Sequence, residues 1–143
     1  MKKLVIFLFL AFVSTAIFCQ NVAITVTNLK TSNGQVSLGI YKDQATFDKE
    51  TPYLLKGFSK SGQVSGGTMK ISLSLPPGDY GVTMLDDENN DSKMEYNWLS
   101  LPREGFGFSN YYTGGFSKPK FSDFRITVVA GKTTTATIKV RYL

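Results

Sequence analysis

The sequence predicts an all-β protein: an antiparallel β-sandwich of about seven strands with one long ordered loop. Three observations support this fold class. Short segments alternate apolar and polar residues, as strands with one buried face do. Turn residues rich in Gly, Pro, Asn and Asp separate these segments at regular intervals. Apolar residues at helical spacing are almost absent, so helices are expected to contribute little.

The first 20 residues, MKKLVIFLFLAFVSTAIFCQ, have the composition of a secretory signal peptide. The apolar run over residues 4–13 is shorter than the roughly 20 residues that span a bilayer, so we expect no transmembrane anchor in the mature protein. A lipoprotein signal, with Cys19 carrying the lipid, is the alternative. We therefore expect a signal peptide over residues 1–19 and one domain over residues 20–143, exported to the periplasm, the outer surface or the extracellular space.

The first two predicted strands lie on either side of a turn signal. In residues 21–29 (NVAITVTNL) and residues 35–41 (QVSLGIY) apolar residues recur at every second position. Between them lies Asn33-Gly34, a dipeptide favoured in tight hairpin turns because both residues tolerate a positive φ. These features predict a first β-hairpin.

A short helical turn and two further strands are predicted next. The turn is expected over residues 43–48, with Asp43 as its N-cap. A weaker strand is expected over residues 56–64 and a clearer one over residues 68–75. Ser-Gly-Gly at 65–67 separates them, which predicts a second hairpin.

The remaining predicted strands follow the same pattern. A Pro-Pro-Gly-Asp turn at residues 76–79 precedes the strand expected over residues 80–85. The last two strands are expected over residues 124–129 and 133–142, with Ala-Gly-Lys at 130–132 between them. Threonines alternate with apolar residues in the closing strand, so one of its faces should be solvated.

Residues 86–123 form the long loop. Compact domains rarely carry so long a connection without a function. This segment is dense in aromatic residues and glycine, which is typical of an ordered loop packed by its own side chains and atypical of disorder.

Composition excludes several classes of function. The chain has no histidine, and its one cysteine is Cys19 in the predicted leader. Zinc sites built on His or Cys, Ser-His-Asp triads and Cys-His dyads are therefore excluded. The formal net charge is +5, and the basic residues are scattered, so no nucleic-acid partner is expected.

Two stretches carry a resemblance to a known family. They are LPPGDYGVTMLDDENNDSKMEYN (residues 75–97) and LPREGFGFSN (residues 101–110). They resemble DUF2141, a family of secreted bacterial proteins of unknown function, in a strand, a PPG turn, an acidic loop and a Pro-x-Glu-Gly-x-Gly-Phe-Ser-Asn segment. A looser similarity extends over nearly the whole mature chain. The resemblance implies an exported all-β domain of the transthyretin-like or immunoglobulin-like kind, with no established activity.

The stretch DDENNDSKMEYN at residues 86–97 offers a candidate cation site. Counted from residue 87, its oxygen-bearing side chains follow a D-x-N-x-D-x-x-x-E spacing. Calcium takes about six to eight oxygen ligands, and alternate positions of a tight loop can point side chains toward one centre. We expect calcium to be bound by four side chains and one main-chain carbonyl, from Asp87, Asn89, Asp91, Lys93 and Glu95.

The alternative is a polar turn, because Asp and Asn side chains also bond local backbone amides. The spacing departs from the EF-hand, since Ser92 and Trp98 stand where that loop has Gly and Glu. The DUF2141 loop usually has glycines where this chain has Asn90 and Ser92. Asp86 and Glu88 lie outside the alternation and are expected in solvent or against backbone amides.

A non-catalytic binding module is the favoured function. The long loop combines aromatic faces with amide and hydroxyl groups, which suits a carbohydrate or peptide ligand. The expected ligand contacts are Trp98, Glu104, Phe108, Asn110 and Tyr111.

Two other functions remain open. One is a carboxylate-based, glycan-active enzyme, in which Asp86 or Asp87 would work with Glu104 as acid and base. The other is a purely structural envelope protein without a ligand. No motif that activates a nucleophile is present, so no catalytic residue is assigned.

Overall fold

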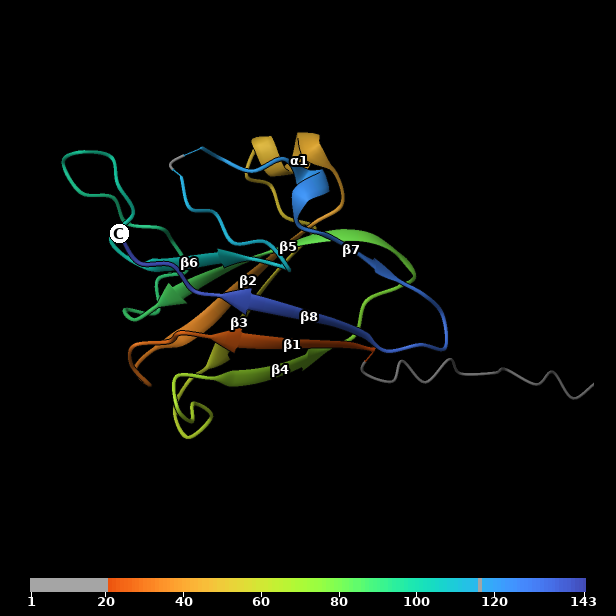
Figure 1. Cartoon of the computed structure of the whole chain (residues 1–143), viewed down its shortest axis with the longest axis horizontal. Helices are drawn as coiled ribbons and strands as arrows, with labels where there is room; N and C mark the ends of the chain where they lie inside the picture. Colours follow the sequence, from red (N-terminus) through yellow and green to blue (C-terminus); the bar gives the residue numbers. More distant parts are fainter. Residues whose placement is uncertain (1–20, 116) are drawn as a thin grey trace, which may run out of the picture.

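The computed structural model describes residues 21–115 and 117–143, and the predicted signal peptide with Cys19 lies outside them. Within this part the chain forms eight strands, one short α-helix and one 3-10 turn. The strands build two sheets that face each other (Figure 1). The predicted all-β sandwich is confirmed, with one strand more than the approximate number expected.

The smaller sheet has three strands in the order β4 (Met69–Leu73), β1 (Val22–Thr27) and β8 (Thr134–Lys139). Strand β1 is antiparallel to β4 and parallel to β8. The first and last strands of the domain are therefore direct neighbours.

The larger sheet has five strands and is antiparallel throughout. Strand β5 (Gly78–Asp87) pairs on one side with β2 (Gln35–Tyr41), which pairs in turn with β3 (Leu54–Ser59). On its other side β5 pairs with β6 (Gly105–Phe108) near its end and with β7 (Arg125–Val128) near its start.

The helical segments are short. Helix α1 (Gln44–Asp48) begins where expected, and the carboxylate of its N-cap, Asp43, accepts a hydrogen bond from the Thr46 amide at 2.8 Å. The 3-10 turn η1 (Phe121–Asp123) precedes β7. Figure 1 shows α1 and η1 above the outer face of the larger sheet.

Both predicted hairpins are wrong. Strands β1 and β2 lie in different sheets, and β3 pairs with β2 while β4 pairs with β1. The alternating pattern tells which face of a strand is buried, but the partner is decided by how both sheets close over one core. Gly34 serves a different purpose: at φ +72° it passes so close to β5 that a Cβ would lie 2.2 Å from the Asp87 carbonyl oxygen.

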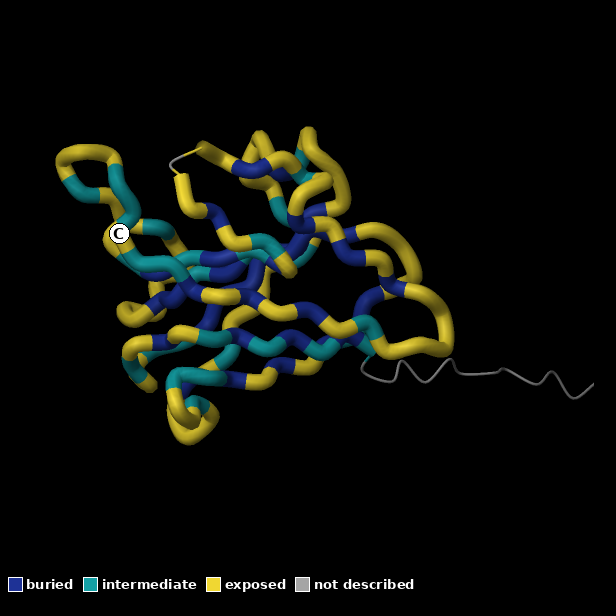
Figure 2. Tube along the Cα trace, in the orientation of Figure 1, coloured by how far each residue is buried: buried dark blue, intermediate teal, exposed yellow. Residues whose placement is uncertain are grey.

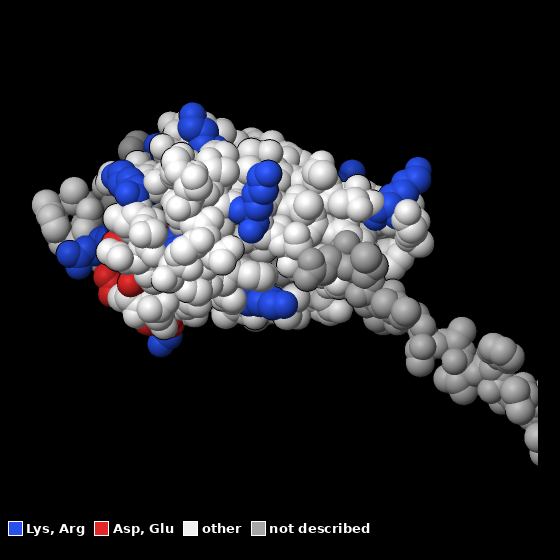
Figure 3. Space-filling model, turned by 90° about the horizontal axis from the view of Figure 1, so that it is seen from below, with Lys and Arg blue, Asp and Glu red and all other residues white. Residues whose placement is uncertain are grey.

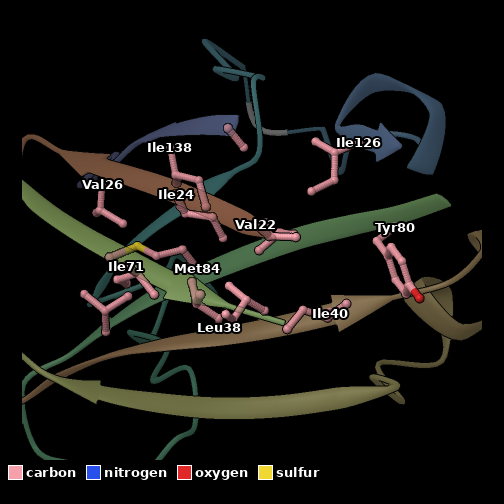
Figure 4. Close-up of a cluster of buried hydrophobic side chains, with 14 of the residues drawn as sticks. Val22, Ile24, Val26, Leu38, Ile40, Ile71, Tyr80, Met84, Ile126 and Ile138 are labelled. Atoms are coloured by element: carbon pink, nitrogen blue, oxygen red, sulfur yellow. The ribbon is translucent and has the colours of Figure 1, made fainter. Parts of the chain in front are cut away.

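The core lies between the two sheets and is made of the inward-facing residues of their strands. Figure 4 shows side chains from both sheets pointing toward one another, among them Val22, Ile24, Leu38 and Met84. In Figure 2, buried residues follow the strands while the connecting turns are exposed. A second, smaller cluster joins Tyr41, Phe47 and Phe124.

Candidate functional site

The acidic loop, residues 87–95, begins at a fully buried carboxylate. Asp87 has none of its surface exposed. It accepts hydrogen bonds from the Gln35 amide group at 2.7 Å, the Ser92 backbone amide at 2.9 Å and the Asp91 backbone amide at 3.1 Å. The Asp87 side chain therefore fixes the loop to the end of β5.

The side-chain oxygens of Asn89 and Asp91 each accept a hydrogen bond from a backbone amide two residues further on, which forms successive local turns. Asn89 Oδ1 accepts from the Asp91 amide at 3.1 Å, and Asp91 Oδ1 accepts from the Lys93 amide at 2.8 Å. Asn89 Nδ2 donates to Asp91 Oδ2 at 3.1 Å and to Glu95 Oε1 at 3.3 Å. Hydrogen bonds among the predicted calcium-binding residues thus hold them close together.

The loop also requires two left-handed residues. Asn90 has φ 61° and Ser92 has φ 58°, and these are the positions at which the DUF2141 pattern usually offers glycine. Asn tolerates this conformation and Ser adopts it less readily. The bonds of the Asp87 carboxylate to the Asp91 and Ser92 amides hold the strained turn in place.

Glu104 lies beside the loop and accepts a hydrogen bond from the Glu95 amide at 3.3 Å. Partial burial raises the pKa of the Glu104 carboxyl above its ordinary value, against the opposing effect of that hydrogen bond. The charges of Asp87, Asp91 and Glu95 raise this pKa further. Figure 3 shows acidic side chains gathered at the end of the molecule toward which β5 runs.

These carboxylates do not form a ready metal centre. Among residues 21–115 and 117–143, no group of three or more Asp, Glu, His or Cys side chains is arranged to hold a metal ion. Calcium therefore remains a prediction for this loop.

The sequence suggested that Asp86 lies in solvent or against backbone amides. The structure places it elsewhere. It shares the inward face of β5 with Val82 and Met84 and is buried, because alternate residues of a strand lie on one face. Its carboxylate forms an ion pair with Lys60 and accepts a hydrogen bond from the Tyr142 hydroxyl. Sequence reasoning missed Lys60, although it stands at strand spacing from the half-buried Phe58.

The Glu-Gly-x-Gly segment joins the two sheets. Phe106 and Arg141 exchange two backbone hydrogen bonds, of 2.9 and 2.8 Å, between β6 and the residues that directly follow β8. At this crossing a Cβ on Gly105 would lie 2.5 Å from the Tyr142 ring, and one on Gly107 would lie 2.5 Å from Ile138 Cγ2. Both glycines are required because the chains pass so closely.

The Ser-Asn pair that follows continues this connection. The buried Ser109 hydroxyl accepts from the Val82 amide at 3.1 Å and donates to the Phe124 carbonyl. Asn110, at φ 53°, bonds Thr137 through its backbone amide at 2.8 Å and its side-chain oxygen at 2.9 Å. The side chain of Asn110, a predicted ligand contact, therefore holds the sheets together.

The predicted aromatic contacts separate in space. Phe108 and Tyr111 pack against the smaller cluster. Trp98 is 89% exposed at the tip of a hairpin formed by the bridge between Tyr96 and Pro102. Hydrogen bonds from the Leu99 and Leu101 amides to Asn97 Oδ1, of 2.9 and 3.0 Å, fix this tip.

A cleft of about 880 Å³ lies on the outer face of the larger sheet. Its floor comes from β2, β5 and β6, and its walls come from the hairpin and from residues 113–115 and 117–119. Of the predicted ligand contacts Phe108 lines the cleft, whereas Trp98, Glu104, Asn110 and Tyr111 do not. The residues that line the cleft include Gly39, Tyr41, Thr83, Leu85, Met94, Tyr96, Leu101, Phe106 and Lys118.

The fold and these features define a small two-sheet β-sandwich with an acidic loop at one end and a cleft over one sheet. The chain belongs to the family described as uncharacterized proteins conserved in bacteria, DUF2141, whose model matches residues 24–137. This match confirms the resemblance carried by the acidic loop and the Glu-Gly-x-Gly segment. No curated protein and no solved structure matches the chain.

In the part of the chain that the structure describes, no helix has the length and apolar character needed to cross a bilayer.

Proposed function

We propose that this protein is a non-catalytic binding module whose ligand occupies the cleft on the larger sheet. The observation that supports this is the cleft itself, at about 880 Å³ and lined mainly by aromatic and aliphatic side chains. Ligand sites in proteins commonly have volumes of about 300–1,000 Å³ and combine such a lining with a few polar groups.

Because Gly39 carries no side chain, the side chains of Thr83 and Tyr41 can lie over it on the floor of the cleft. A Cβ at this position would lie 2.8 Å from Thr83 Oγ1 and 3.3 Å from the Tyr41 ring, so the sheet accepts little more here than glycine. Met94, Tyr96 and Leu101 of the hairpin stand on one side. The half-open site therefore offers an apolar surface between a rigid sheet and a loop.

Two polar side chains of the cleft, Thr83 and Lys118, are already hydrogen-bonded, which favours a peptide with apolar side chains over a carbohydrate. Thr83 Oγ1 donates to the Gly39 carbonyl at 3.3 Å, and Lys118 Nζ donates to the Phe47 carbonyl at 3.2 Å. Lys118 also lies 3.7 Å from the Glu50 carboxylate. A sugar needs many unengaged donors and acceptors, and these groups are already bonded.

Replacing Tyr96 by alanine is expected to weaken peptide binding about tenfold, because losing a well-packed aromatic contact costs about 1–2 kcal/mol. Titration calorimetry would be run with short peptides rich in Leu, Phe and Tyr, and with a panel of oligosaccharides. Trp98→Ala is the matched control, since it removes an aromatic ring from the same hairpin outside the cleft.

An affinity loss in Trp98→Ala but not in Tyr96→Ala would place the ligand at the hairpin tip and reject the cleft. Binding of oligosaccharides alone would reject the peptide. If neither set of probes binds, the purely structural alternative is favoured.

We also propose that calcium stabilises the acidic loop. The specific support is that two carboxylates of the loop come close to one another, since Asp91 Oδ2 and Glu95 Oε1 lie 3.1 and 3.3 Å from the same atom, Asn89 Nδ2. A cation would relieve their repulsion, with Asp87, Asn89, Asp91, Glu95 and the Lys93 carbonyl as its oxygen ligands. The Asp87 carboxylate already fixes the turn that presents them.

Calcium at about 100 times its Kd is expected to raise the free energy of unfolding by about 2.7 kcal/mol, and chelator should reverse this. Thermal unfolding with calcium and then with chelator would measure it. Asp91→Ala should abolish the response, because it removes an exposed ligand without emptying a buried position. Asp48→Asn, at an exposed acid of α1, is the control and should keep the response. Identical curves in calcium and chelator would rule out the calcium site.

A further inference from the structure

A lysine and an aspartate are buried together at one end of the core. The side chains of Lys60 and Asp86 are both 0% exposed, and they form a direct ion pair between Nζ and Oδ1. Lys60 follows β3 and Asp86 lies on β5, so the pair reaches across β2. Removing two charges from water costs free energy, even when the charges form an ion pair with each other.

Other groups complete this site. The Tyr142 hydroxyl donates to Asp86 Oδ2 at 2.5 Å and accepts from the Lys30 amide at 3.1 Å. Burial, and after it the hydrogen bond to Asp86, raises the pKa of the Tyr142 phenol above its ordinary value, so it remains a proton donor. Lys60 Nζ also lies 3.5 Å from the Thr31 hydroxyl, which donates to Glu88 at 3.0 Å.

This arrangement has the parts of an amide-forming site. A lysine amine becomes a nucleophile once it has passed a proton to a neighbouring carboxylate, and the carboxylic acid formed in that step offers the carbon to be attacked. The Tyr142 hydroxyl is aimed at the carboxyl oxygen on which negative charge would develop during the attack. The absence of exposed surface limits competing water.

We propose that Lys60 and Asp86 become joined by an intramolecular amide bond, an isopeptide cross-link between the residue that follows β3 and strand β5. One proton passes from Nζ to Oδ1, which gives a neutral amine and a neutral acid. The Nζ lone pair attacks Cγ, a second Nζ proton moves to Oδ1, and the Cγ–Oδ1 bond breaks. The products are one amide and one water, and no oxidant or other reactant is needed.

Each neighbouring group has a defined part in this reaction. Tyr142 stabilises the charge on Oδ2, which becomes the carbonyl oxygen of the amide. Thr31 is a positioning residue that orients Nζ. The cross-link closes the chain covalently between residues 60 and 86, as a disulfide would, in a chain whose one cysteine is Cys19.

Mass spectrometry of the mature chain, residues 20–143, tests this proposal. The intact mass is expected to fall below that calculated from this sequence by one water. After trypsin digestion, residues 57–70, uncleaved at Lys60, should be joined to residues 71–93. Fragment ions must show two N-termini, at Gly57 and Ile71, because an uncleaved linear peptide 57–93 has the same mass.

Variants separate the chemistry from the fold. Lys60→Met and Asp86→Ala should lose the water deficit, and Lys56→Met, at an exposed lysine of β3, should keep it. Tyr142→Phe should lower the cross-linked fraction. An intact wild-type mass equal to the sequence would overturn the proposal without any variant. A water deficit confined to residues 71–93, with Lys60 cleaved, would identify a succinimide and overturn it as well.

Discussion

Asp86→Ala is expected to lower the free energy of unfolding by about 3–5 kcal/mol relative to wild-type protein in which the cross-link has not formed, because it leaves the buried Lys60 without its acidic partner. The partner that stays is the Thr31 hydroxyl, at 3.5 Å, which cannot compensate a buried positive charge. Chemical denaturation, followed by circular dichroism, would measure the loss.

Asp79→Ala on the same strand is the matched control. Asp79 pairs with Arg125 at 3.5 Å, and both side chains are about half exposed, so its ion pair is worth about 1 kcal/mol or less. The double variant Lys60→Met, Asp86→Leu should recover much of the stability, since apolar residues of similar size can replace a buried pair. Equal losses for Asp86→Ala and Asp79→Ala would show that burial of the Lys60 pair contributes nothing.

Gly105→Ala is expected to cost about 1–3 kcal/mol through overpacking. The added Cβ would lie 2.5 Å from Tyr142 Cε1 and 2.6 Å from Val140 Cγ1, so the ring or the strand must move. The displaced ring would also lengthen its hydrogen bond to Asp86. The same denaturation measurement applies to this variant.

Gly114→Ala is the control for this substitution, because nothing lies within 4 Å of its added Cβ. It should leave stability within about 0.5 kcal/mol of wild type, as surface substitutions usually do. If both variants lost the same stability, the close passage of β6 and the residues that directly follow β8 would not be the cause.

The sequence indicated the strands and the α1 cap because these depend on neighbouring residues. Alternation located β2 with the observed bounds, and Asp43 was recognisable as an N-cap from its position alone. The partners of the strands were missed because they depend on the whole core: β1 finds β4 and β8, both distant in sequence. Strand β6 was hidden inside the long loop, since its Gly-Phe-Gly-Phe sequence lacks an alternating polar face.

The candidate sites also divide into one that depends on neighbouring residues and others that distant parts of the chain assemble. The acidic loop was found because its turns are local, between Asn89, Asp91 and Lys93. The cleft could not be found, since separate strands and two loops assemble it. Lys60 and Asp86 were missed because charged residues are ordinarily on the surface. Their burial depends on both side chains pointing into the core at the same end of the sandwich.

The parallel pairing of β1 with β8 has a consequence for how the chain folds. Val22 lies opposite Thr134, so nearly the entire domain forms the loop that this contact closes. Contacts so distant in sequence carry a high entropic cost and slow the folding of β-rich domains. Until the last strand has been synthesised, β1 has one vacant edge of unpaired amides and carbonyls, the kind of surface through which unfinished chains associate. Completion of the domain is therefore a late event that depends on its C-terminal strand.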